Sequence, residues 1–240
     1  MPNTNTNTTT TKTNTSSGTG DAASPDERRE PLTADRVLTG ALELADAIGV
    51  ESFTIRKLAD QLDVRPMTIY HHVANKEAII DGIVDLVFSE IELPPEDVDW
   101  KRAIRRRCDS VREVLARHPW APPLMESRTS PGDATLRHHD AVIGCFRRGG
   151  LSLEMTAHAY AVVDSYVYGF AHQEANLPFN GTEDIGELAD AIIAELPVDE
   201  FPHLTEFTAQ HVLRPGYSFG ASFEFGLELI LDGLEAAARG

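Results

Sequence analysis

Apolar residues in the first third of the chain recur every three or four positions, which is the spacing of one face of an α-helix. The first such stretch begins after Thr33 and ends at Gly49. Its apolar stripe consists of Val37, Leu38, Ala41, Leu42, Ala45 and Ile48. Because threonine caps the start of helices and glycine ends them, the pattern predicts a helix between these two residues.

Residues 54–76 predict two short helices joined by a tight turn. Thr54 is a suitable N-cap for the first helix, which has one apolar face. That face consists of Ile55, Leu58, Ala59 and Leu62. Asp63 stands where the chain must turn, because aspartate tolerates the left-handed backbone region. Pro66 fits the first turn of a second helix, which we expect to last about two turns, to His72. Two helices joined in this way form a helix-turn-helix, whose second helix enters the major groove of DNA.

Helical spacing continues to the C-terminus and strand-type alternation is absent, so we predict an all-α fold. The expected helices run from Lys76, after an Asn75 cap, to the Pro94-Pro95 pair, and then over 100–117, 134–148, 152–174, a region near 185–196, and 219–238. Prolines bracket a short irregular piece between 122 and 132, and residues 175–218 look loop-rich. We predict a disordered Thr/Asn-rich arm over residues 1–30, a helix-turn-helix domain over 31–78 and a second domain over 79–240.

The net charge of −17 is unusual for a DNA-binding chain, so its location matters. Residues 81–240 carry 13 basic and 27 acidic side chains, a net charge of −14. Residues 31–80 carry 5 basic and 7 acidic side chains, a net charge of −2. The broad positive surface that is typical of nucleic-acid-binding proteins is therefore missing. We expect a few placed contacts and dimerisation to supply the affinity for DNA.

The cysteine content and the N-terminus both favour a cytoplasmic protein. Cys108 and Cys145 are the two cysteines of the chain, which is typical of a reduced protein with small buried thiols. No apolar run reaches the length of about 18 residues that a membrane span needs. Residues 1–20 are polar and lack the apolar core of a secretory signal.

The helix-turn-helix segment closely resembles the DNA-binding domain of the tetracycline-repressor (TetR) family of bacterial transcription regulators. The densest part reads Thr-x-Arg-Lys-Leu-Ala, then Leu-x-Val, then Thr-Ile-Tyr-x-His-Val-x-Asn-Lys, within residues 54–76. The resemblance spans about Thr33 to Glu92, and a weaker one continues through 150–154 and 225–235. It implies a ligand-responsive regulator, most often a repressor, that binds a palindromic operator as a homodimer and is released by a small-molecule inducer.

The resemblance also implies which residues contact DNA. Arg56 matches a position that reads guanine, for which the arginine fork is well suited. The recognition helix would add Arg65, Pro66, Met67, Thr68, Tyr70 and His71, and phosphate contacts would come from His72 and Lys76. The alternative is a solvated face around a core formed by Ile69 and Val73. Arg28 and Arg29 either reach DNA or form a solvated pair.

The resemblance assigns residues 152–174 and 219–238 to a four-helix bundle between two subunits. The last helix supports this assignment independently, because its apolar residues are too many for one buried stripe. A family-like pocket would be lined by Arg107, Val111, Met125, Arg128, Val142, Tyr160, Asp164 and Tyr168. Tyr160, Asp164 and Tyr168 share one helical face, either as polar tips toward a ligand or as a hydrogen-bonded core or dimer seam. Arg107 has the alternative interpretation of a solvated arginine on a charged helix.

The metal site of the tetracycline-sensing members is not preserved. Met125 falls at their magnesium-binding histidine and Gln173 at their water-linked glutamate, while Glu92 and Arg107 fall at two drug-contacting positions. A thioether and an amide are poor partners for Mg²⁺. We therefore predict no metal, no cofactor, and an effector other than tetracycline.

Other functional classes are less well supported by the sequence. No His-Glu-x-x-His, glycine-rich phosphate loop or Gly-x-Ser-x-Gly motif occurs, so we do not predict an enzyme. Adjacent histidines, as in His71-His72 and His138-His139, point about 100° apart on a helix, and His158 and His172 lie about 21 Å apart along one. Two alternatives remain open: a regulator that needs its ligand to bind DNA, and a helical adaptor that does not bind DNA.

Overall fold

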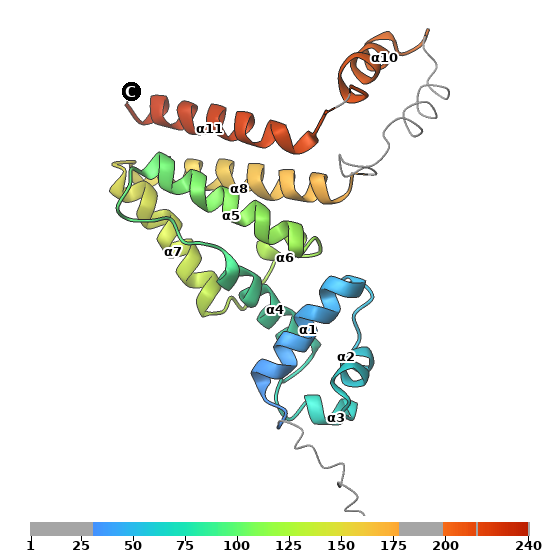
Figure 1. The fold of residues 1–240 in the computed structure, drawn as a ribbon. Helices are drawn as coiled ribbons and strands as arrows, with labels where there is room; N and C mark the ends of the chain where they lie inside the picture. The colour runs from blue at the N-terminus through green and yellow to red at the C-terminus, as the bar shows by residue number, and fades with distance from the viewer. Residues whose placement is uncertain (1–30, 178–198, 215, 240) are drawn as a thin grey trace, which may run out of the picture. The chain divides into compact units, whose positions relative to one another are not determined.

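The computed structural model describes residues 31–177, 199–214 and 216–239, and every regular element in these ranges is helical (Figure 1). The helices are α1 (Ala34–Ile48), α2 (Ile55–Leu62), α3 (Pro66–Ile69), α4 (Lys76–Glu90), α5 (Trp100–Arg117), α6 (Pro122–Met125), α7 (Asp133–Arg148), α8 (Leu153–Ala175), α10 (Pro202–Phe207) and α11 (Ser222–Arg239). A π-helix, Thr208–Val212, continues α10, and a 3-10 turn, Phe219–Ala221, precedes α11. The predicted all-α class is confirmed. No helix within the described ranges is both long and apolar enough to cross a membrane.

Side-chain caps start the N-terminal helices where the sequence predicts them. Thr33 accepts a hydrogen bond from the backbone N–H of the third helical residue of α1, and Thr54 and Asn75 do the same for α2 and α4. Gly49 ends α1 with a φ of 74°, and Asp63 ends α2 in the left-handed region with a φ of 53°. These local signals satisfy backbone groups that a helix end leaves unpaired.

The second helix of the motif is shorter than the predicted two turns. Its α-helical part covers only Pro66–Ile69. The chain then closes through hydrogen bonds from the N–H of His71 to the carbonyl of Thr68 and from the N–H of His72 to the carbonyl of Ile69. These bonds span three residues and tighten the last turn, as is common at helix ends.

Two apolar cores lie one on each side of α4. Ile79, Ile80 and Ile83 of α4 belong to a core with α1, α2 and α3. Val84, Val87 and Phe88 of the same helix belong to a larger core with α5, α7, α8 and α11. Because one helix contributes to both cores, a shift of its C-terminal half also displaces its N-terminal half.

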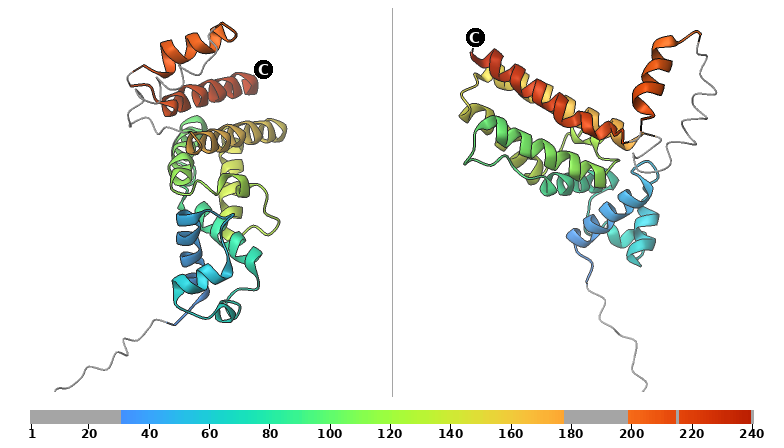
Figure 2. Two further views of the ribbon diagram at one scale, coloured as in Figure 1. Left: turned by 90° about the vertical axis from the view of Figure 1, so that its right-hand side faces the viewer. Right: turned by 45° about the horizontal axis from the view of Figure 1, so that its top comes forward.

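The C-terminal helices pack in sequence-distant pairs. Helix α8 contacts α5, α7 and α11, and α8 and α11 run alongside each other (Figure 2). Lys101 and Arg105 of α5 form ion pairs with Asp232 and Glu228 of α11. These contacts hold α11 against α5 as well as α8.

Two regions that were expected to be irregular contain helices. Residues 122–132 include the single turn α6, which begins at Pro122 because proline suits a first turn. Residues 202–212 are helical, whereas the sequence suggested loop there. The helix predicted near 185–196 lies outside the described residues.

Candidate functional site

Helix α3 presents a group of side chains to solvent. Ile69 is fully buried and anchors the helix to the N-terminal core. Met67 and Tyr70, a large apolar and an aromatic side chain, are 69% and 42% exposed on this short helix. The other exposed members of the predicted DNA-contacting set are Arg56, Arg65, Pro66, His71 and Lys76, while Thr68 and His72 are half-buried.

The start of α4 is tied to the segment before α2. Lys76 donates a hydrogen bond from Nζ to the carbonyl of Phe53 at 3.0 Å, and its ammonium lies 5.8 Å from the centre of the Phe53 ring. An ammonium has three donors, so this bond leaves Lys76 able to contact a phosphate as well. This contact joins the segment before α2 to the start of α4, one on each side of the helix-turn-helix.

A buried polar cluster lies in the larger core, centred on Arg107 of α5. The Arg107 guanidinium is fully buried and donates from Nη1 to Oδ1 of Asp164 at 2.5 Å, and from Nη2 to the Tyr168 hydroxyl at 3.3 Å. Its Nε donates to Nε2 of His138 at 3.1 Å. The interpretation of Arg107 as a solvated arginine is therefore wrong. Its partners on α7 and α8 lie far away in the sequence, so the periodicity of α5 alone could not place it.

His138 is held neutral in this cluster. Burial, together with the nearby charge of Arg107, lowers the pKa of His138 to about 2. Because Nε2 accepts the bond from Arg107, the proton of the neutral ring lies on Nδ1. That atom is buried without a hydrogen-bond partner among the described residues, as is Oδ2 of Asp164.

A cavity of about 110 Å³ lies beside this cluster, between α4 and α7. Met125 and Arg128 of the predicted pocket line it, together with Asp81, Val84, Glu126, Ser130, Pro131, Thr135 and His139. Tyr160 contacts Nδ1 of His139 through its hydroxyl. The cavity is smaller than the roughly 300 Å³ at the lower end for small-molecule sites, so a ligand of that size requires side chains to move.

The predicted pocket residues separate into three groups. Arg107, Asp164 and Tyr168 form one hydrogen-bonded cluster, whereas the Tyr160 hydroxyl contacts His139, which lines the small cavity. Val111, Met125 and Val142 are packing residues of the larger core. Arg128 forms ion pairs with Asp81 at 2.5 Å and Glu77 at 2.8 Å, both on α4. The sequence allowed this face of α8 to be either polar tips toward a ligand or a hydrogen-bonded core. Asp164 and Tyr168 fit the hydrogen-bonded core.

Sequence reasoning missed three residues at this site. His138, His139 and Glu126 were not predicted to contribute, although the first accepts from Arg107 and the other two line the cavity. A usable signal was present in α7, where His138 falls on the same helical stripe as the buried Val142 and Cys145. A histidine at a core position of a helix needs a polar partner when it is buried.

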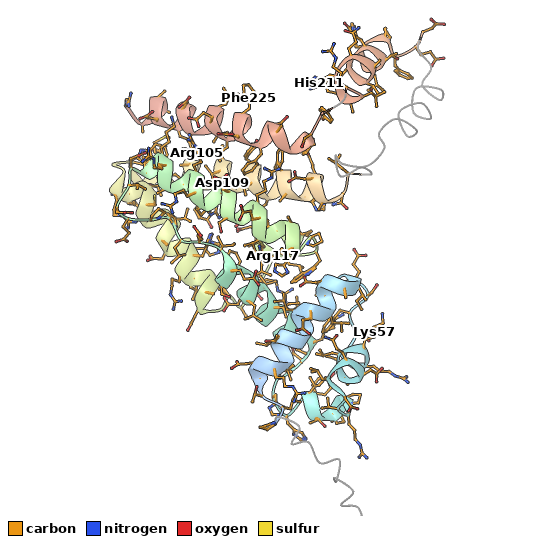
Figure 3. The ribbon with its side chains drawn as sticks, viewed as in Figure 1. Lys57, Arg105, Asp109, Arg117, His211 and Phe225 are labelled. Carbon is orange, nitrogen blue, oxygen red and sulfur yellow. The ribbon has the colours of Figure 1, made fainter. Side chains whose placement is uncertain are left out.

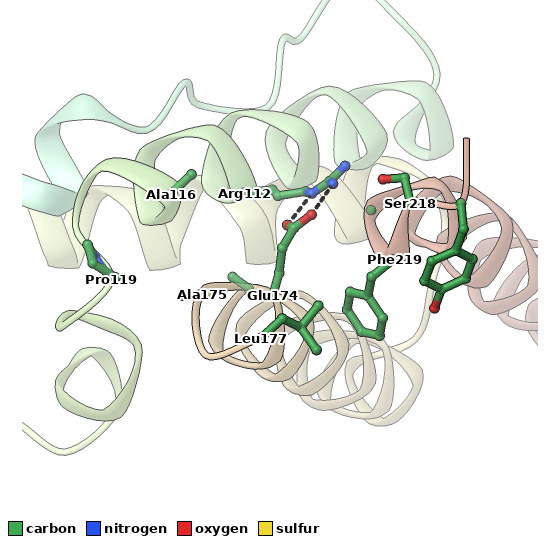
Figure 4. A pocket seen from close by; sticks show the side chains of 11 residues that line it. Arg112, Ala116, Pro119, Glu174, Ala175, Leu177, Ser218 and Phe219 are labelled. Atoms are coloured by element: carbon green, nitrogen blue, oxygen red, sulfur yellow. Dashed lines mark hydrogen bonds and ion pairs between the residues drawn. The ribbon is translucent and has the colours of Figure 1, made fainter. Parts of the chain in front are cut away.

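A larger cavity of about 440 Å³ lies at the C-terminal ends of α5 and α8 (Figure 4). Arg112 and Glu174 cross it with two hydrogen bonds of 2.8 and 2.6 Å. The guanidinium also lies over the rings of Phe170 and Phe223. None of the predicted pocket residues lines this cavity, and its two charged groups neutralise each other.

Helices α8 and α11 carry an exposed face of apolar and small residues. Phe225 and Leu229 of α11 are 69% and 59% exposed, and Figure 3 marks Phe225 on this helix. Val162 of α8 is also exposed. A Cβ added to Gly169 or Gly233 would meet no neighbouring atom within 4 Å. The face is therefore open, and its backbone is accessible at these glycines.

The residues at the metal positions of tetracycline-sensing relatives do not converge. Met125 is buried in the larger core, whereas Gln173 is exposed on α8. Within the described ranges, no group of three or more His, Cys, Asp or Glu side chains is placed to hold a metal ion.

Together, an exposed recognition helix on one core and a buried polar cluster in a second core define a helix-turn-helix transcriptional regulator. A family model described as bacterial regulatory proteins of the tetR family matches residues 37–83. A second model, the tetracyclin repressor-like C-terminal domain, matches residues 93–238. The chain belongs to the TetR family of transcriptional regulators.

Relatives from actinomycetes resemble the chain over most of its length. An HTH-type transcriptional regulator of Saccharopolyspora erythraea is 30% identical over 88% of this chain and 88% of its own. The HTH-type transcriptional repressor DrrR1 of Streptomyces coeruleorubidus is 29% identical over 85% of this chain and 77% of its own. The crystal structure of the TetR family protein ActR of Streptomyces coelicolor, in complex with actinorhodin, matches with a TM-score of 0.72 and 28% identity over 88% and 98% of the two chains.

Proposed function

We propose that the protein is a homodimeric repressor that binds a palindromic operator and is released by a small molecule bound beside the Arg107 cluster. The observation that carries this proposal is the placement of α4. This helix contributes to the core of the helix-turn-helix and also lines the cavity next to the cluster. The similarity to the repressor DrrR1 and to an actinorhodin-bound ActR supports the repressor role and the small-molecule effector.

The DNA-binding part of the proposal rests on the exposed surface of α2 and α3. Arg56 has the side chain that pairs with the two major-groove acceptors of guanine, and Tyr70 presents a hydroxyl and a ring at the end of α3. Both side chains are exposed, and the Tyr70 hydroxyl forms no hydrogen bond with any residue that the structure describes. Arg65, Pro66, Met67, Thr68 and His71 complete the proposed base and backbone contacts, with His72 and Lys76 on phosphates.

The dimeric part rests on the apolar face of α8 and α11. Two copies of this face would form a four-helix interface about a two-fold axis, which is the commonest arrangement of soluble homo-oligomers. Gly169 and Gly233 would let the helices approach closely. A palindromic operator then follows, because two recognition helices must enter major grooves about 34–36 Å apart.

The coupling between effector and DNA runs through α4. Arg128 holds α4 by its ion pairs with Asp81 and Glu77, and Asp85 accepts hydrogen bonds from the first residues of α7. A ligand that enlarges the cavity has to displace some of these contacts. Such a ligand binds more tightly to a state in which α4 has moved than to the DNA-binding state. This difference in affinity sets how much the ligand weakens DNA binding.

The test is fluorescence anisotropy of the purified protein on DNA from upstream of its own gene, with random DNA as competitor. Unmodified protein should bind one palindromic segment specifically. Arg56→Ala and Tyr70→Ala should each lower the affinity by about 10- to 100-fold, the cost of one good base contact. Arg106→Ala removes the same charge from an exposed position on α5 and should leave the affinity unchanged.

Other outcomes separate the alternatives. If the protein binds DNA only after a small molecule is added, the regulator that needs its ligand is correct. Failure to bind any sequence selected from random DNA, by a folded dimer, would contradict the helix-turn-helix assignment and favour the adaptor.

A further inference from the structure

Glu126, which lines the small cavity, and the nearby Asp164 both have carboxylate oxygens without a hydrogen-bond partner among the described residues. Asp164 uses Oδ1 for Arg107, while its Oδ2 is buried without a hydrogen bond. Glu126, which follows α6, lines the cavity, and its carboxylate forms no hydrogen bond or ion pair with any described residue. Carboxylates accept hydrogen bonds from donors and attract cations. The site therefore offers unused acceptors.

The surrounding positive charges are already engaged. Arg107 is paired with Asp164, and Arg128 is paired with two carboxylates of α4. Partial burial raises the pKa of Glu126, and the charge of Asp164 raises it further, although His139 and Arg107 lower it. The negative charge of Asp164 therefore reaches the carboxyl group of Glu126. Counting these groups, the cavity carries an excess of negative charge.

Two aromatic rings surround His139, which lines the cavity. The His139 ring lies 5.4 Å from the Phe88 ring and 5.9 Å from the Tyr160 ring, measured between centroids. Burial raises the pKa of Tyr160, and the charges of Asp164 and Glu126 raise it further, so its ring stays a neutral phenol. Aromatic faces attract cations, and they also pack against apolar groups.

We propose that the effector is an amphipathic organic cation, with a protonated amine beside Glu126 and Asp164 and an apolar body against Phe88, His139 and Tyr160. This inference rests on the proposed function and adds the chemical class of its effector. A carboxylic acid of the same shape would face Glu126 without a compensating positive charge, and the site would reject it. The amine binds in a state in which the cavity is larger than in the structure.

The test compares three probes of one shape: naphthylmethylamine, naphthylmethanol and naphthoate. Isothermal titration of the full-length protein should give tightest binding for the amine. The alcohol should bind about ten-fold or more weakly, because it lacks a charge-assisted hydrogen bond. Naphthoate should show no saturable binding. Equal or tighter binding of naphthoate, or no binding of the amine at millimolar concentration, would overturn the proposal.

Variants locate the bound amine. Glu126→Gln keeps the shape of an exposed side chain and should weaken amine binding by about ten-fold. Asp164→Asn should do the same, but it leaves Arg107 without its ion pair, so its fold must be checked by circular dichroism. Because the chain has a net charge of −17, cations also gather nonspecifically. Glu154→Gln, an exposed change on α8, controls for this and should leave the affinity unchanged. An unchanged affinity for Glu126→Gln would also overturn the proposal.

Operator binding measured without any probe tests the proposed function separately. If the protein binds its operator but the amine neither binds nor releases it, the effector class is wrong and the repressor remains. If the amine binds as expected but no operator is bound, the repressor is wrong and the cation site remains.

Discussion

At the scale of the residue, the Arg107 cluster shows how a charged group is tolerated in an apolar core. Three of its nitrogens donate to Asp164, His138 and Tyr168, so burial does not leave them unsatisfied. Removal of one partner from such a group typically costs several kcal/mol, because the remaining charge stays buried. The cluster therefore ties α5, α7 and α8 to one relative arrangement.

His138 makes the stability of this cluster dependent on pH. Its pKa is about 2 in the folded protein and 6.5 in its ordinary state, so below pH 6.5 the unfolded chain binds a proton that the folded chain refuses. Stability is therefore complete above pH 6.5 and is lost as the pH falls. We expect unmodified protein to lose up to roughly 2–3 kcal/mol more than His138→Gln between pH 6.5 and 4.5.

Urea denaturation at several pH values measures this difference. The amide oxygen of His138→Gln can still accept from Arg107, so the variant removes the titration and keeps an acceptor. His203→Gln, at an exposed position on α10, should follow the unmodified protein. If the free energy of unfolding falls equally with pH in the unmodified protein and in His138→Gln, His138 does not control the acid sensitivity.

At the scale of the element, His118 joins three helices at the end of α5. Its Nδ1 lies 2.7 Å from Oδ1 of Asp46 on α1, and its Nε2 lies 3.3 Å from Oε2 of Glu90 on α4. Trp120 donates to the same Asp46 oxygen at 2.8 Å, and Arg117 contacts Glu90 at 2.5 Å. The contact connects the first helix of the DNA-binding core to the larger core.

We expect His118→Ala to lower the free energy of unfolding by about 1–2 kcal/mol, since a buried pair of hydrogen bonds is lost while both carboxylates keep a second partner. The same variant should need a different effector concentration for half-maximal operator release, because α1 is no longer held to α5. Chemical denaturation and operator titration measure the two effects. His203→Ala serves as the exposed control. A change in stability without any change in release would restrict His118 to a structural role.

At the scale of the whole molecule, the apolar face of α8 and α11 predicts the assembly. Leu229→Asp places a charge at the centre of this face, and we expect it to shift the protein from dimer to monomer in light scattering. Operator affinity should fall with it, because one recognition helix binds half a palindrome. Leu136→Asp makes the same change at an exposed position on α7 and should leave the dimer intact. A dimeric Leu229→Asp would contradict the proposed interface.

The sequence predicted the helix-turn-helix well because its signals are local. Thr54, Asp63 and Pro66 each act within one turn of chain, and the structure has them as an N-cap, a left-handed turn residue and a first helical residue. The buried thiols of Cys108 and Cys145 were predicted from residue type and are also confirmed. The sequence overestimated the length of α3. After Ile69 the chain forms tighter three-residue turns, and these depend on the packing of the domain.

The polar cluster is where local reasoning failed. The sequence favoured a solvated Arg107, and it gave His138 no role beyond an adjacent histidine pair that is unsuited to a metal. The partners of Arg107 lie 31, 57 and 61 residues away in the chain. Helical periodicity gives the direction of a side chain within its own helix and carries no information about which polar group will face it.

By itself, the sequence determined the all-α class, the position of the recognition helix and the family. It did so because caps, turns and apolar stripes depend on neighbours within a few residues. Only the tertiary structure decided that Arg107 is buried, that Glu126 stands unpaired beside Asp164, and that α4 connects the cavity to the DNA-binding core. These properties depend on distances between helices, which packing fixes and no local pattern encodes.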